Sequence, residues 1–226
     1  MPTLNENNST TLMKMVEAVA INPENARILV AQYEAQAKKL QPKASDSAIQ
    51  KIVTDKVIER YCRLAATSGA VTALPGVIPG AGTALALVGG GMVDVTACMK
   101  LQIDMTMCLA MSINKNLSNE DAKHMSFIIA LVGSLEKMGV AGASNVASKA
   151  GVKMVKHYLS GTTLKFIKKL FEKVGVAFTQ KAAIKAIPLG FGAIIAGTAN
   201  YALTQYVGST ARKMFLLNIE EKGVAA

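Results

Sequence analysis

The polar side chains best placed to take part in chemistry interrupt one apolar, methionine-rich stretch of the chain. These residues are Asp94, Gln102 and Asp104. In a helix, the ten positions from Asp94 to Asp104 turn through about 1000°, roughly 80° short of three full turns, so the two carboxylates need not face each other. A catalytic carboxylate pair is therefore not predicted. Asp94 and Gln102 lie about 80° apart and could both face one neighbouring helix. They are interpreted either as buried polar groups that set helix register or as a proton or ligand site.

Other residue types that usually carry catalysis show no supporting pattern. His124 and His157 are the only histidines, and neither has a further ligand at a recognised metal-binding spacing. Cys62, Cys98 and Cys108 are odd in number and lack a short paired spacing, which favours reduced thiols in a core over disulfides or a zinc site. A phosphate-binding glycine loop and a serine nucleophile motif are also missing. We therefore expect a non-enzymatic protein with no catalytic residue, cofactor or metal.

The sharpest local pattern is a basic, amphipathic segment between residues 164 and 178. At helical spacing its apolar side chains fall on one side and its lysines lie largely around the other. Such a helix can lie in a lipid interface, with lysines meeting anionic headgroups. It can equally be a surface helix that covers a protein core. The expected membrane-contacting residues are Lys165, Phe166, Lys168, Lys169, Phe171, Lys173 and Phe178.

The distribution of charge along the chain also favours contact with an anionic surface. Residues 115–185 hold twelve lysines against four acidic residues, so eight of the ten excess positive charges lie in this segment. A localised positive face suits an anionic surface. Nucleic acid is disfavoured because arginine is rare and no aromatic stacking platform is interleaved with the lysines. An anionic lipid membrane is therefore the expected first partner, and a protein partner or homo-oligomer is the alternative.

Two long uncharged runs rich in small residues are the other prominent feature. The first covers thirty residues from Leu64 to Val93, and the second covers residues 186–211. About 20 apolar residues can cross a bilayer, but Pro75 and Pro79 should break a simple helix in the first run. Glycines at four-residue spacing allow close helix contact, in a membrane-inserting hairpin, an oligomer seam or a tightly packed interior. The expected helix-packing residues are Gly76, Gly80, Gly82, Gly90, Gly192 and Gly197.

The remaining pattern predicts an all-α fold, a compact helical bundle with glycine-rich apolar helical hairpins. Asn22 before Pro23 is typical of a helix start, and Ser45 to Ser47 can begin the next helix. Ser118 with Asp121 resembles a capping pattern for a helix that ends near Lys137. Alternation typical of strands is nearly absent.

The segment from Asp94 to Gln102, together with residues 69–76 before it, resembles the EcsC family of bacterial proteins. Further support comes from residues 117–123 and 128–134 and from the closing segment, residues 187–215. That closing segment is the most specific part, and it also resembles a related uncharacterised domain found beside small GTPase modules. The resemblance covers about residues 50–217. It implies a helical, membrane-linked domain but supplies no reaction mechanism.

These observations lead to one expected organisation and one expected role. Residues 1–44 are expected to form a helical extension, and residues 45–226 an EcsC-like helical domain. The first residues lack a basic segment followed by an apolar one, so a cytoplasmic location is expected, peripheral to the inner membrane or partly inserted in it. The expected role is membrane association through the basic helix and the glycine-rich segments. The alternatives are a soluble adaptor that docks a transporter or GTPase, and a membrane-inserting pore-forming protein.

Overall fold

The computed structural model describes residues 6–67, 90–140, 163–184 and 191–223, and in these ranges the protein is helical without strands. The all-α prediction is confirmed. The described helices are α1 (Glu6–Val19), α2 (Pro23–Leu40), α3 (Asp46–Thr67), α5 (Gly90–Ile113), α6 (Asn119–Lys137), α8 (Thr163–Ile184) and α9 (Phe191–Gly223).

The helix starts predicted from capping residues are found in the structure. Asn22 accepts a hydrogen bond from the Asn25 amide at 2.8 Å, which satisfies a free backbone donor at the start of α2. The Ser118 side chain accepts a hydrogen bond from the Asp121 amide at the start of α6, at 3.1 Å. These local bonds explain why both helices begin where the short polar side chains stand.

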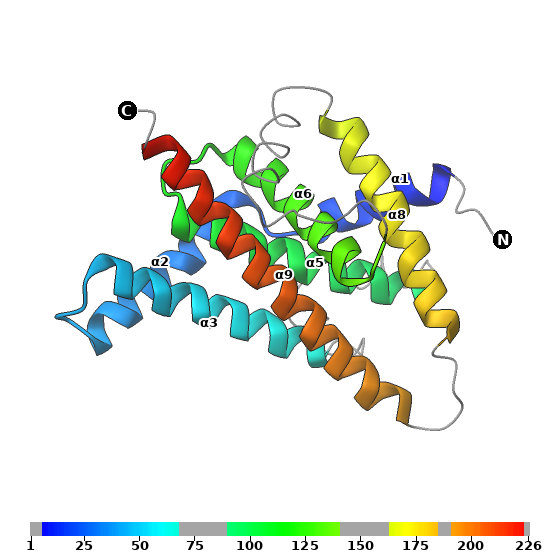
Figure 1. The fold of residues 1–226 in the computed structure, drawn as a ribbon, viewed down its shortest axis with the longest axis horizontal. Helices are drawn as coiled ribbons and strands as arrows, with labels where there is room; N and C mark the ends of the chain where they lie inside the picture. Colours follow the sequence, from blue (N-terminus) through cyan, green and yellow to red (C-terminus); the bar gives the residue numbers. More distant parts are fainter. Residues whose placement is uncertain (1–5, 68–89, 141–162, 185–190, 224–226) are drawn as a thin grey trace.

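Helix α5 lies at the centre of the bundle and packs against every other described helix (Figure 1). Every residue from Thr96 to Asn114 is buried. A helix that is apolar nearly all round is stable only when other helices surround it. Helices α3, α6 and α9 provide most of this cover, and α9 also runs alongside α3 (Figure 1).

Helices α1 and α2 belong to the same hydrophobic core as the rest of the chain. Leu12 and Val16 from α1, and Ala26 and Val30 from α2, are buried together with residues of α5 and α8. The expected boundary near residue 44 stays a prediction, because a shared core does not say whether the parts fold separately.

Among the expected packing glycines, Gly197 has a clear structural role. It lies where α9 meets the end of α3, and a methyl group built on it would stand 2.7 Å from the carbonyl oxygen of Ala66. Only a residue without a side chain allows this approach. Gly90 and Gly192 begin or nearly begin their helices, without a described environment for either residue, and Gly76, Gly80 and Gly82 lie outside the described residues.

We predict that Gly197→Ala lowers the free energy of unfolding by about 1–3 kcal/mol, because the methyl group meets backbone that cannot rotate away. The matched control is Gly133→Ala in α6, where the added carbon would lie 3.5 Å from Val207, an ordinary contact. Thermal and urea unfolding of both variants measures the difference. Equal stability of the two variants would contradict the close crossing of α3 and α9.

Candidate functional site

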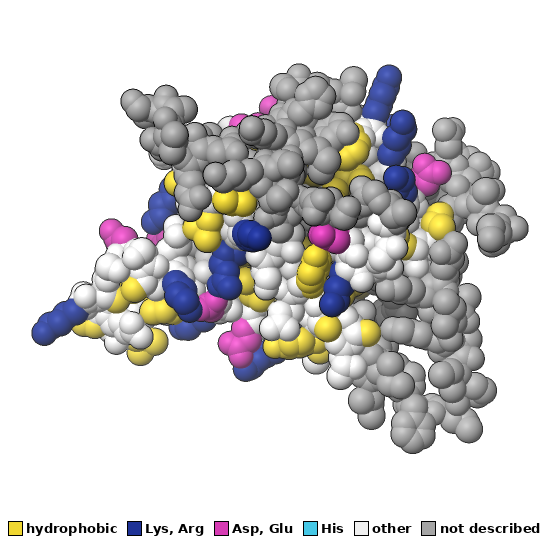
Figure 2. Space-filling view, viewed as in Figure 1, with side chains coloured by type: hydrophobic (Ala, Val, Ile, Leu, Met, Phe, Trp, Pro, Cys, Tyr) yellow, Lys and Arg dark blue, Asp and Glu magenta, His cyan; other side chains and the backbone are white. Residues whose placement is uncertain are grey.

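Helix α8 presents a row of lysines on its outer side. Lys165, Lys169 and Lys173 are exposed and Lys168 is half-buried, with Glu172 the one acidic residue among them. In Figure 2, basic side chains gather along the edge of the molecule that α8 occupies in Figure 1. Because the lysines share one side of one helix, their charges act on the same external surface.

The apolar side of α8 faces the interior of the protein. Ile167, Leu170, Phe171 and Val174 are buried there. Helices α1 and α6 cover this side, and the Phe171 ring lies 6.1 Å from the ring of Phe127 in α6, at a tilt of 60°. Such a tilted aromatic pair is typical of a packed core.

The structure therefore corrects the expected lipid contact of Phe171, whose side chain is fully buried against protein. Phe166 is half-buried at the edge of the same core. The physical reason is that an apolar helix face gains by leaving water whether lipid or protein covers it, so periodicity alone does not identify the cover. The environment of the Phe178 side chain lies outside the described residues.

Asp94 and Gln102 are the expected buried polar groups of the central helix, and of these two Gln102 has a described environment. Its amide oxygen accepts a hydrogen bond from Ser134 of α6, and its amide nitrogen lies 3.4 Å from the Cys98 sulfur. These bonds favour a role in setting the register of α5 against α6. Asp94 lies within α5, but the environment of its side chain is outside the described residues.

The most highly charged buried group is an ion pair whose lysine the sequence patterns did not single out. Lys100 and Asp104 stand four residues apart in α5, and their side chains are 8% and 4% exposed. Asp104 also accepts a hydrogen bond from the Ile21 amide at 2.7 Å, which ties the turn between α1 and α2 to the central helix. The i, i+4 spacing of opposite charges in an apolar helix was the available signal.

Burial raises the pKa values of the Asp104 carboxyl group and of two buried thiols. Burial raises the pKa of Asp104, although Lys100 and the Ile21 amide oppose the rise. Burial also raises the pKa of Cys108 to about 12 and that of Cys62 to about 11. Because the thiolate is the reactive form of cysteine, these two thiols are poor nucleophiles at neutral pH.

A second charged group lies at the surface between α3 and α9. Asp55 pairs with Lys51 of its own helix at 2.8 Å and also with Arg212 of α9. Burial alone would raise the pKa of Asp55, but hydrogen bonds from Lys51 and Arg212 outweigh it and the pKa is lowered from 3.8. One carboxylate thus serves two cations.

Among the described residues, no cluster of side chains has the composition of a metal site. Within the same ranges, no helix combines the length and apolarity needed to cross a bilayer.

We predict that the buried pair is energetically coupled. Asp104→Leu should cost about 3–5 kcal/mol, because it leaves Lys100 charged and unpaired in the core. The double variant Lys100→Met with Asp104→Leu should recover much of this loss. As a control, a double-mutant cycle on the exposed pair of Glu59 and Arg63 should give a coupling energy of less than about 1 kcal/mol. Urea unfolding measures all variants. Additive losses at Lys100 and Asp104 would refute the coupling.

We also predict an acid-dependent contribution from Asp55. A lowered folded-state pKa means that its stabilisation is present above about pH 4 and is lost as the pH falls through the folded-state pKa. Asp55→Asn should therefore lower the free energy of unfolding at pH 7, by less than about 1 kcal/mol because the site is half-exposed. This difference should shrink toward pH 3. A difference that stays constant with pH would contradict the assignment.

Comparison with known proteins leaves function to be inferred from the charges, burial and contacts of the described residues. No family model matches the chain, and no curated protein or solved structure matches it.

Proposed function

We propose that this protein is a non-enzymatic helical protein that attaches to the surface of an anionic membrane through the lysine row of α8. The observation that carries the proposal is the arrangement of Lys165, Lys168, Lys169 and Lys173 on one outward side of a helix whose other side is anchored in the core. A rigidly held row of cations can meet many lipid headgroups at once.

The magnitude is sufficient for reversible attachment. Each lysine near an anionic lipid surface contributes about 1 kcal/mol, so four lysines contribute roughly 4 kcal/mol. Attachment of this kind weakens as salt screens the charges over about 8 Å at physiological ionic strength. The proposed attachment is therefore salt-sensitive.

The packing of α8 favours adhesion over insertion for this helix. Phe171 and Val174 are fully buried against the protein, so inserting the apolar side would first require separation from α1 and α6. Electrostatic contact through the lysines requires no such rearrangement. The glycine-rich residues 68–89 lie outside the described ranges, and their proposed part in packing or insertion rests on the sequence alone.

Two further considerations support this proposal. The resemblance of residues 50–217 to the EcsC family implies a membrane-linked domain, and the proposed location is the cytoplasmic side of the inner membrane. The buried thiols with raised pKa values also give little support to an enzymatic alternative.

We predict that reversing the four lysines to glutamate abolishes sedimentation with vesicles that contain phosphatidylglycerol, since roughly three orders of magnitude in binding are lost. The matched control reverses Lys39, Lys43, Lys56 and Lys213. Like the four lysines of α8, this set contains three exposed lysines and one half-buried lysine. This control has the same net charge and should retain most binding. High salt should release the native protein from the vesicles.

Three results would overturn the proposal. Equal loss in both quadruple variants would indicate a nonspecific effect of net charge. Binding to neutral phosphatidylcholine vesicles that resists high salt would indicate insertion through other segments. Failure of the native protein to bind anionic vesicles at low salt would favour the soluble adaptor.

A further inference from the structure

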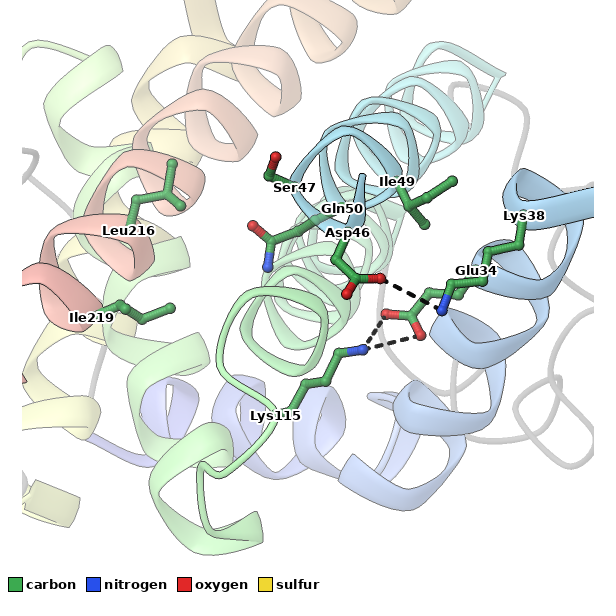
Figure 3. A pocket seen from close by; sticks show the side chains of 9 residues that line it. All are labelled: Glu34, Lys38, Asp46, Ser47, Ile49, Gln50, Lys115, Leu216 and Ile219. Carbon is green, nitrogen blue, oxygen red and sulfur yellow. Dashed lines mark hydrogen bonds and ion pairs between the residues drawn. The ribbon is translucent and has the colours of Figure 1, made fainter. Parts of the chain in front are cut away.

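A surface groove lies between the first half of α3 and the C-terminal part of α9. It comprises two adjoining cavities of about 390 and 320 Å³, which share Ser47, Gln50 and Leu216. Figure 3 shows α3 and α9 side chains on opposite sides of the larger cavity, with Lys115 at one border. Cavities of roughly 300–1,000 Å³ are the usual size for small ligands.

The α9 side of the groove is apolar and open. Leu216 and Ile219 stand one helical turn apart and are 41% and 40% exposed, and Figure 3 shows both beside the cavity. Ile113 lines the smaller cavity and Ile49 the larger one. An apolar chain lying along Leu216 and Ile219 would remove these two side chains from water.

The charges are distributed unequally between the two ends. At the larger cavity each cation has its own carboxylate: Lys115 lies 3.0 Å from Glu34, and Lys38 lies 3.7 Å from Asp46. At the smaller cavity Lys51 and Arg212 share the single carboxylate of Asp55. Among the described side chains, that end therefore carries one positive charge more than it has carboxylates, which favours an anion there.

We propose that the groove binds an anionic amphiphile, with a carboxylate or phosphate headgroup at Lys51 and Arg212 and an acyl chain along Leu216 and Ile219. The cavity volumes favour a single chain over a partner helix, which is about 10–12 Å wide. The site is distinct from the lysine row of α8, since the two lie at opposite ends of the molecule (Figure 1). It does not rest on the proposed membrane attachment.

Calorimetric titration of the full chain at pH 7 tests this site, with each amphiphile kept below its micelle concentration. Decyl phosphate and decanoate distinguish a phosphate from a carboxylate headgroup, and saturable binding of one molecule of either is expected. Inorganic phosphate lacks the acyl chain and loses its burial, and neutral decyl maltoside lacks the charge and loses the charge-assisted hydrogen bonds. Each should therefore bind at least tenfold more weakly.

Variants locate the ligand. Arg212→Gln removes a charged hydrogen-bond donor and Leu216→Asn removes an apolar contact, so each should weaken binding about tenfold. The controls Arg63→Gln and Ile28→Asn change an ion-paired arginine and an exposed apolar residue outside the groove, and they should leave binding unchanged. Asp55→Asn should tighten binding about two- to fivefold, because it removes the carboxylate that competes for both cations.

Thermal melts confirm that each variant is folded before titration. No saturable binding of either anionic amphiphile, or equal effects of groove and control variants, would overturn the site and leave the groove to a protein partner. Weaker binding by folded Asp55→Asn would overturn the proposed headgroup position. The quadruple α8 variant should still bind decyl phosphate, so failure of vesicle attachment and failure of this site are distinguishable.

Discussion

The burial of α5 from Thr96 onward is the constraint on which the rest of the structure depends. This stretch packs against every other described helix and has no side facing water, so a polar group on it is costly unless it has a partner inside the protein. Gln102 accepts a hydrogen bond from Ser134, and Lys100 forms an ion pair with Asp104. The buried pair in turn binds the Ile21 amide, so the polar groups of the core also position the turn between α1 and α2.

The need to bury its own apolar side explains the orientation of α8. Helices α1 and α6 pack on its apolar side, and the aromatic contact between Phe127 and Phe171 fills the space between α6 and α8. Once that side is buried, the lysines are left outward as a row. The proposed surface for anionic lipid is thus a consequence of how the core closes.

The groove between α3 and α9 has a different origin. The two helices approach closely at Gly197, near the C-terminal end of α3, where backbone meets backbone. Near the start of α3, Leu216 and Ile219 occupy the facing positions on α9 and remain partly exposed beside the cavities. One pair of helices therefore supplies both a tight contact and an open, apolar groove bordered by Lys51 and Arg212.

The sequence by itself determined the all-α class, the capped starts of α2 and α6, and the two-sided character of α8, because capping bonds and helical periodicity act within a few residues. It also marked Gly197 and Gln102 as residues for helix contact. Only the tertiary structure decided that Phe171 faces protein, that Lys100 pairs with Asp104 inside the core, and that Asp55 is shared by Lys51 and Arg212. The physical reason is that local pattern shows which side of a helix leaves water, whereas the partner on that side comes from segments as far apart as 157 positions in the chain.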